Sequence, residues 1–300
     1  MRIITPASTL QEAELLLLSG ASALIVDVKE ESISHLGNAH LHRSAVGRET
    51  ITSIDELRRI CNCARHHAAE TYACLDAESY SDKGMRRITD LVGFICRDIG
   101  IDGVITCNPG LIVAIREEKI AVDVVLSPEE LVLNKQTVLF WNDLGVMKII
   151  LPSYLNVSEI AKLSTSVAGC SFYITAIRGY VPSTDTSSPA EAPSASLEDG
   201  KIVENVNDIF CALCTIPRLS RAGVSGATIN LEGEPCNAKI GLVTVVKRLI
   251  EMVEKGISDE EVKSIAIEEM ECGQLKESGY LCLDGRELTP ETHHGKSHPS

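Results

Sequence analysis

Short apolar runs alternate along the chain with longer segments in which apolar residues recur every three or four positions. A short run of aliphatic residues is typical of a buried strand, and the longer spacing is typical of an amphipathic helix. The apolar runs predict eight strands: Arg2–Thr5, Ala23–Val28, Thr71–Asp76, Gly103–Cys107, Val122–Leu126, Lys148–Leu151, Ser171–Ile177 and Ala227–Leu231.

The segments between these runs carry signals that start and stop helices. A capping residue followed three positions later by Glu or Gln is typical of a helix start. This spacing occurs four times, at Ser8–Gln11, Ser53–Glu56, Ser127–Glu130 and Asn156–Glu159. Gly20 and Gly256 follow apolar helical segments and predict helix ends, because glycine adopts the left-handed conformation that often follows a last turn. The longest segment predicts a helix from about Asn237 to Lys255.

Eight strand–helix units in series imply right-handed crossovers and a parallel sheet. We therefore predict a (β/α)8 barrel of the TIM type, with an open doubly wound sheet as the alternative. The barrel is expected over residues 1–256. A C-terminal helical extension is expected over 257–289, because Ser258 and Glu261 predict one more helix, followed by a disordered polar tail over 290–300.

Charge and composition narrow the classes of partner. The chain has 300 residues and a formal net charge of -14, which argues against a broad nucleic-acid-binding surface. No segment is long and apolar enough to span a bilayer, and Met1–Ile4 lacks the features of a signal peptide. We expect a cytoplasmic protein.

Polar residues lie at the carboxyl ends of the predicted strands, where the active sites of barrel enzymes are found. We predict Glu232 and Asp76 as catalytic carboxylates, because each ends or follows a strand and a carboxylate there can act as a general base. The predicted substrate-binding residues are Asp27, Asn108, Ser127 and Arg178. For Ser127 a plain helix cap is the alternative, and for Arg178 a solvated surface position.

The chain has 11 cysteines. Cys211 and Cys214 are expected on one face of a helix, a spacing that suits half of a metal or cluster site. Cys236 and Cys107 are expected near the carboxyl ends of strands and complete the candidate ligand set. The alternative is that these cysteines are buried core residues, because a free thiol packs like a small apolar group.

Several segments resemble a known family in the right order. Val125–Pro152 and Tyr154–Lys162 resemble its strand ending in Ser, its Asn-containing helix with a Leu-Gly-Val phrase, and the helix start that follows. Glu70–Asp76, Gly100–Arg116 and Asn207–Gly233 resemble its third strand, a Pro-Gly unit and its closing passage. On these residues the chain resembles the peptidase U32 family, from about Pro6 to Ile250.

The resemblance implies a barrel and either proteolysis or oxygen-independent hydroxylation of tRNA, rRNA or a quinone precursor. In hydroxylation branches a cysteine-rich segment holds an iron–sulfur cluster, but here no cysteine lies between Ser171 and Phe210. A 4Fe–4S cofactor therefore stays open. We expect an enzyme or enzyme-derived barrel that binds a small anionic or peptide-like substrate. The alternatives are a non-catalytic partner of a cysteine-complete homologue and a hydroxylase with a relocated cluster.

Overall fold

The computed structural model describes residues 1–28, 51, 53–75, 80–128, 132–153, 155–180, 196–198, 201–203, 209–232, 236–272 and 280–282. Eight of its strands run parallel: β1 (Arg2–Pro6), β2 (Ala23–Asp27), β3 (Glu70–Cys74), β4 (Gly103–Thr106), β5 (Asp123–Leu126), β6 (Lys148–Ile150), β7 (Ser171–Tyr180) and β11 (Gly226–Glu232). Each lies on one of the eight predicted strands, to within a few residues at the ends, so the hydrophobic pattern located all of them.

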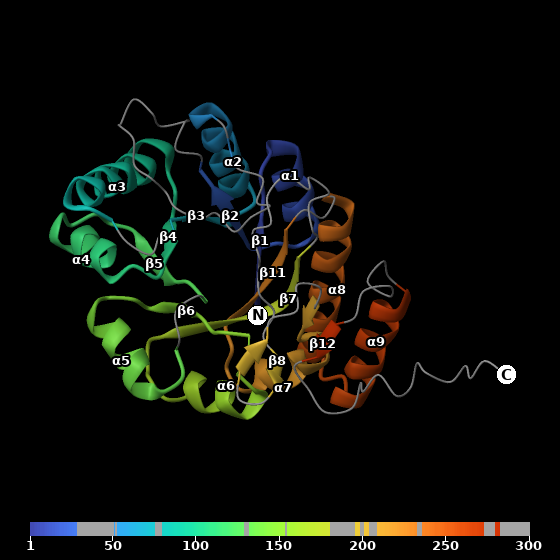
Figure 1. Cartoon of the computed structure of the whole chain (residues 1–300). Helices are drawn as coiled ribbons and strands as arrows, with labels where there is room; N and C mark the ends of the chain where they lie inside the picture. Colours follow the sequence, from blue (N-terminus) through green and yellow to red (C-terminus); the bar gives the residue numbers. More distant parts are fainter. Residues whose placement is uncertain are drawn as a thin grey trace, which may run out of the picture.

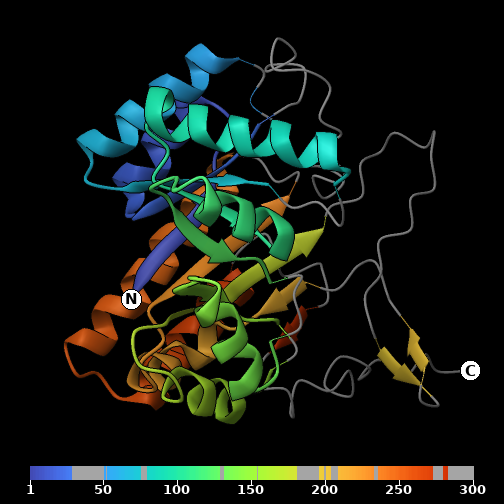
Figure 2. The ribbon, with the colours of Figure 1, turned by 90° about the vertical axis from the view of Figure 1, so that its left-hand side faces the viewer.

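These eight strands close into a barrel. Each strand from β1 to β6 pairs in parallel with the next one along the chain, and β11 pairs with both β1 and β7. Helices surround the strands in Figure 1, and Figure 2 shows the barrel after a quarter turn. The chain is a (β/α)8 barrel, as predicted, and the alternative of an open doubly wound sheet is wrong because β11 returns to β7.

The helices follow the strands in the expected order. They are α1 (Leu10–Ser19), α2 (Ile54–His66), α3 (Asp82–Phe94) with the π-helix η2 (Ile95–Ile99), α4 (Pro109–Glu117), α5 (Lys135–Asp143), α6 (Val157–Ser164), η3 (Leu213–Thr215) with α7 (Ile216–Arg221), α8 (Cys236–Glu254) and α9 (Asp259–Cys272). Helix α9 packs beside α8 outside the ring (Figure 1). Among the described residues, no helix has the length and apolar content needed to cross a membrane.

Two of the four predicted helix starts are confirmed. Ser53 caps α2, and Asn156 forms a complete capping box with Glu159 at the start of α6. The start predicted at Ser8 is wrong by one residue, because Thr9 caps α1 while Ser8 donates hydrogen bonds to Glu12.

The start predicted at Ser127 is not tested, because residues 129–131, which follow it, lie outside the described residues. Helix α5 begins at Lys135, and Asn134 caps it by accepting a hydrogen bond from the backbone of Thr137 at 3.0 Å.

Further strands lie outside the predicted set. β8 (Ser196–Glu198) and β9 (Lys201–Val203) form a small antiparallel pair. β10 (Ile209–Cys211) pairs antiparallel with the second half of β7, and β12 (Tyr280–Cys282) pairs in parallel with β10. The helix predicted through Cys211 and Cys214 is therefore wrong. Pairing with β7 draws Cys211 into a strand, and Cys214 lies in the one-turn 3-10 helix η3.

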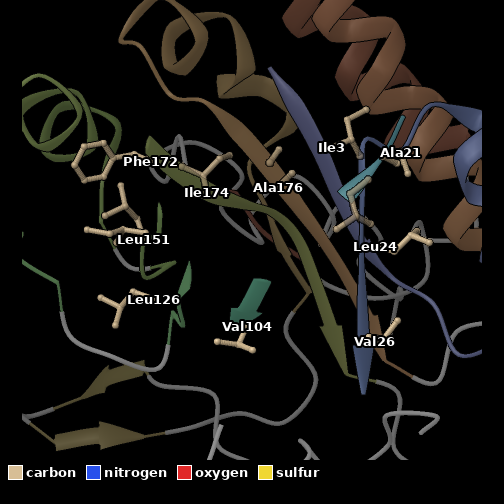
Figure 3. Close-up of a cluster of buried hydrophobic side chains, with 14 of the residues drawn as sticks. Ile3, Ala21, Leu24, Val26, Val104, Leu126, Leu151, Phe172, Ile174 and Ala176 are labelled. Atoms are coloured by element: carbon tan, nitrogen blue, oxygen red, sulfur yellow. The ribbon is translucent and has the colours of Figure 1, made fainter. Parts of the chain in front are cut away.

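The apolar core divides into two layers because successive strand residues face opposite sides. The larger layer lies between the strands and the helices. The members labelled in Figure 3 are Ile3, Ala21, Leu24, Val26, Val104, Leu126, Leu151, Phe172, Ile174 and Ala176. The smaller layer fills the barrel interior and consists of Ile4, Ala23, Tyr72, Ile105, Val125, Ile150 and Tyr173, with Ile25 packed against it.

Charged side chains close the amino end of the barrel below the interior layer. The Lys148 ammonium donates hydrogen bonds to Asp123 at 2.7 Å and to the Tyr72 hydroxyl at 2.8 Å, and Arg2 pairs with Glu70 at 2.7 Å. Burial by itself lowers the pKa of Lys148, but the bonds to Asp123 and Tyr72 outweigh it, so the pKa lies above its usual value. Lys148 is therefore held in its charged form, and this end of the barrel is occupied by structural ion pairs.

Candidate functional site

A layer of small and mostly polar residues lies at the carboxyl end of the barrel. Each is two residues beyond a member of the interior apolar layer, so alternation places it on the interior side. The layer consists of Pro6, Asp27, Cys74, Cys107, Ser127, Pro152 and Thr175, with Thr228 as the register partner of Thr175. We call this set the mouth layer. It stands above the interior layer that Tyr72 and Tyr173 fill, at the end where barrel enzymes act.

The structure brings Asp27 and Cys74 together. They are register partners at the carboxyl ends of the neighbouring parallel strands β2 and β3. The backbone carbonyl of Asp27 accepts a hydrogen bond from the amide of Ile51 at 2.7 Å. The predicted binding residue Asp27 therefore has a thiol-bearing neighbour that sequence reasoning missed.

Thr175 and Thr228 form the second pair of the mouth layer. They lie on the neighbouring parallel strands β7 and β11. They are register partners, both are buried, and the Thr228 hydroxyl donates to the Ile174 carbonyl at 3.3 Å. An irregularity between Thr228 and Ile229 then shifts the pairing by one residue. Such a bulge redirects the residues that follow it, and bulges are frequent next to active sites.

Beyond this bulge the backbone register places two predicted site residues near the barrel end. Arg178 pairs with Asn230, and Glu232 pairs with Tyr180, so the two predicted residues lie on adjacent strands two register steps apart. Asp76, the other predicted catalytic residue, lies outside the described residues. The catalytic roles of Glu232 and Asp76 stay predictions.

Asn108 and Ser127 follow strands β4 and β5, and both are buried. The Asn108 side chain accepts a hydrogen bond from the Leu111 amide at 3.0 Å and caps α4, so its oxygen has a structural role. Ser127 follows β5, and its amide donates to the Thr106 carbonyl at 3.3 Å. The predicted binding role of Ser127 and its helix-cap alternative both stay predictions, because residues 129–131 lie outside the described residues.

A buried ion pair joins helix α1 to helix α8 near the carboxyl end of the barrel. The Lys239 ammonium on α8 donates to Glu12 on α1 at 2.8 Å, and both side chains are less than a tenth exposed. The other Glu12 oxygen accepts from the Ser8 amide and hydroxyl, each at 2.8 Å. Burial raises the pKa of Glu12, but Lys239 and Ser8 outweigh it, so the pKa lies below its usual value. The carboxylate stays charged and anchors the turn after β1.

The four cysteines predicted as ligands lie on different elements. Cys107 follows β4, Cys236 begins α8, Cys214 lies in η3, and Cys211 is buried in the outer apolar layer. All four are reduced thiols, and the described residues contain no group of three or more His, Cys, Asp or Glu side chains that could hold a metal ion. As they lie, these residues do not fit an iron–sulfur cluster.

Sequence reasoning missed Cys74, Thr175, Thr228 and Asn230. A signal was available, because each lies an even number of residues from Tyr72, Tyr173 or Gly226, the interior positions of β3, β7 and β11. The alternation can be used only when the residues of each strand that face the barrel interior are known. The bulge after Thr228 also interrupts this alternation along β7.

Comparisons with known proteins agree with this architecture. The family described as Peptidase family U32 matches residues 9–176, which is more than half of the chain. Two curated relatives, each called tRNA hydroxylation protein P, come from Haemophilus influenzae and Escherichia coli K12. They are 26% and 25% identical to the chain over 165 residues, which is 55% of this chain and 33% of each relative. The chain thus spans about a third of the length of these relatives.

Solved structures support the fold. The U32 peptidase Mk0906 superposes with a TM-score of 0.52 at 15% identity, covering 78% of this chain and 94% of that protein. A 4-hydroxy-tetrahydrodipicolinate synthase from Methylacidiphilum fumariolicum SolV also gives 0.52, at 12% identity, covering 89% of this chain and 77% of the synthase. At these identities the likeness concerns the barrel and not the chemistry.

Proposed function

Because this chain belongs to peptidase family U32, we propose that it is an enzyme or enzyme-derived protein whose substrate binds at the carboxyl end of the barrel. The observation that carries the proposal is the mouth layer, where large interior side chains give way to small polar ones around the end of the strands. Barrel enzymes bind their substrates at this end.

We propose a small anionic or peptide-like substrate. Asp27, Ser127, Thr175 and Thr228 offer the donors and acceptors that a peptide group requires. Arg178, whose backbone pairs with Asn230 on β11, supports this proposal because arginine binds carboxylates through two parallel hydrogen bonds. Catalysis by Glu232 and Asp76 and the cytoplasmic location remain predictions of the sequence.

Ligand titrations of matched variants test this proposal. We expect a member of a panel of small carboxylates and acetylated dipeptides to raise the thermal midpoint of the wild-type chain, because a ligand that binds only the folded state stabilises it. Asp27→Asn and Thr175→Val are expected to abolish the shift. The control is Thr5→Val, since Thr5 is also a buried threonine but lies one residue from the interior position Ile4 and so faces the helices. A shift that survives in both mouth variants contradicts a site at this end.

A role in hydroxylation is the second candidate, favoured by the match to two proteins that carry tRNA hydroxylation in their names. Since the four candidate cysteines do not fit a cluster, we propose that the chain acts there as a non-catalytic partner of a cysteine-complete homologue. The net charge of -14 disfavours direct binding of RNA by this chain.

Metal analysis after anaerobic purification separates these alternatives. We expect far less than one iron and one sulfide per chain, together with co-purification of a homologue when the two are expressed together. Stoichiometric iron and sulfide that disappear in Cys211→Ala and persist in Cys96→Ser would instead establish a relocated cluster. Cys96 is a suitable control because it is also a reduced thiol and lies in η2, away from the predicted set.

A further inference from the structure

Asn230 lies near the carboxyl end of β11, on the side of the strand that faces the barrel interior. A β-carbon at Gly226 would lie 2.6 Å from the Tyr173 ring of the interior layer, so Gly226 faces inward. Ala227 and Ile229 belong to the outer apolar layer. Because successive strand residues alternate sides, Asn230, four residues beyond Gly226, faces the same side as that glycine.

The bulge beside Asn230 does not change this direction. Consecutive residues of β11 pair with Thr175 and Ile177 of β7, so the extra residue, Ala176, belongs to β7. The two strands lie side by side (Figure 1), and the alternation along β11 continues without interruption to Asn230. An extra residue bends only the strand that carries it. Asn230 is therefore directed into the mouth of the barrel.

The carboxamide of Asn230 is available to a ligand. Asn230 is partly exposed, whereas Thr175 and Thr228 are buried. Within the part of the chain that the structure describes, this carboxamide makes no hydrogen bond to another residue. A carboxamide carries two donor hydrogens and one acceptor oxygen. Asn230 can therefore offer both a donor and an acceptor to a molecule that enters the mouth.

The hydroxyls beside Asn230 are neutral. The Thr228 hydroxyl donates its hydrogen to the Ile174 carbonyl at 3.3 Å, so toward the mouth it can only accept a hydrogen bond. Its register partner Thr175 carries a second hydroxyl. Thr228 and Asn230 thus place an acceptor and a carboxamide two residues apart on one side of the strand. This arrangement suits the N–H and C=O of an amide, which are recognised by hydrogen bonds and not by charge.

We propose that Asn230 is a specificity-determining residue that binds an amide group of the substrate. The inference rests on the proposed function, because it takes the carboxyl end of the barrel as the binding site. Of the two substrate classes named there, it selects the peptide-like one. The Asn230 Oδ1 accepts from the amide N–H, and Nδ2 donates to the carbonyl. A site that bonds an N–H discriminates strongly against an analogue that lacks it.

Ester analogues test this inference on the full chain. Each acetylated dipeptide of the panel is compared with analogues in which an ester oxygen replaces either of its two amide N–H groups, and calorimetry gives the dissociation constants. We expect one replacement to weaken binding to the wild type at least about tenfold, the factor that 1.4 kcal/mol produces. In Asn230→Ala the ratio between amide and ester should fall toward one, because the acceptor is gone.

Two further variants make the test specific to Asn230. Asn230→Asp keeps an acceptor but loses the donor, so it should bind more weakly than the wild type and still prefer the amide to the ester. Asn237→Ala is the matched control, because Asn237 is an exposed asparagine on α8. It should keep both the affinity and the preference. Thermal unfolding without ligand verifies that all three variants are folded.

The outcomes separate this inference from the proposed function. A wild-type chain that binds no member of the panel overturns both. Binding that is lost in Asp27→Asn and Thr175→Val but unchanged in Asn230→Ala overturns the role of Asn230 alone. A preference for the amide that Asn230→Ala retains, or ester analogues that all bind the wild type as tightly as the amides, has the same consequence.

Discussion

We expect Lys239→Met to lower the free energy of unfolding by about 3–5 kcal/mol, because it leaves a buried carboxylate without its counter-charge. Glu12 keeps its two hydrogen bonds from Ser8 but loses the ammonium at 2.8 Å. The desolvation of Glu12 is then no longer offset by an opposite charge. Urea denaturation followed by circular dichroism at neutral pH measures the loss.

The same variant should change its response to pH. In the wild type the pKa of Glu12 lies below its usual value, since Lys239 and Ser8 outweigh the effect of burial. The ion pair therefore stabilises the fold above about pH 4.3, the pKa of an unfolded-state glutamic acid, and its contribution is lost as the pH falls through the folded-state value. In Lys239→Met burial dominates, so acidification protonates Glu12 and narrows the difference between variant and wild type.

Two further variants control this result. Arg248→Met removes another ion pair of α8, that between Arg248 and Glu269, but these side chains are more than a third exposed on average and we expect a loss of under about 1 kcal/mol. The double variant Glu12→Gln/Lys239→Met should recover part of the stability, because no buried charge remains. A loss in Lys239→Met no larger than that in Arg248→Met contradicts an energetic role for the buried pair.

The second large effect is expected at Gly226. A β-carbon at this position would lie 2.6 Å from the Tyr173 ring and 2.8 Å from the Arg2 carbonyl oxygen. The ring is buried in the interior layer and has no free space to move into. Gly226→Ala should therefore destabilise the barrel by about 1–3 kcal/mol, the usual cost of overpacking a core. Thermal and urea unfolding measure this cost.

Controls separate the steric clash from a general effect of removing a glycine. Gly241 lies on the exposed side of α8 with no atom within 4 Å of an added β-carbon. Gly241→Ala should stabilise the chain by about 0.5–1 kcal/mol, because alanine is the better helix former. In a double-mutant cycle with Tyr173→Leu, the cost of Gly226→Ala should shrink. An unchanged cost would mean that the ring is not the cause.

The close contact between a glycine and a tyrosine ring occurs a second time in the barrel, between β3 and β4. A β-carbon added to Gly103 on β4 would likewise lie 2.6 Å from the Tyr72 ring, with the Asp123 carbonyl oxygen at 2.9 Å. Each tyrosine thus fills the interior beside a strand that has no side chain at that point. Two tyrosines therefore occupy the interior of a barrel in whose chain aromatic residues make up only 4%.

Local patterns in the sequence are sufficient to predict the strands, the order of the units and several helix ends. Aliphatic runs such as Val124–Leu126 form buried strands, and the Asn156–Glu159 pair satisfies the backbone at a helix start. The carboxyl ends of the strands then identify the end of the barrel where Asp27 and Ser127 lie, because parallel strands all point the same way.

Which residues meet depends on tertiary packing. Register places Cys74 beside Asp27 and Thr175 beside Thr228, and a one-residue bulge determines which β7 residues follow them. The Glu12–Lys239 pair joins residues 227 positions apart, so no local spacing could predict it. Pairing with β7 likewise overrode the helical pattern around Cys211. The spacing of apolar residues indicates which side of a helix or strand is buried. Which residues that side contacts depends on how distant segments of the chain pack.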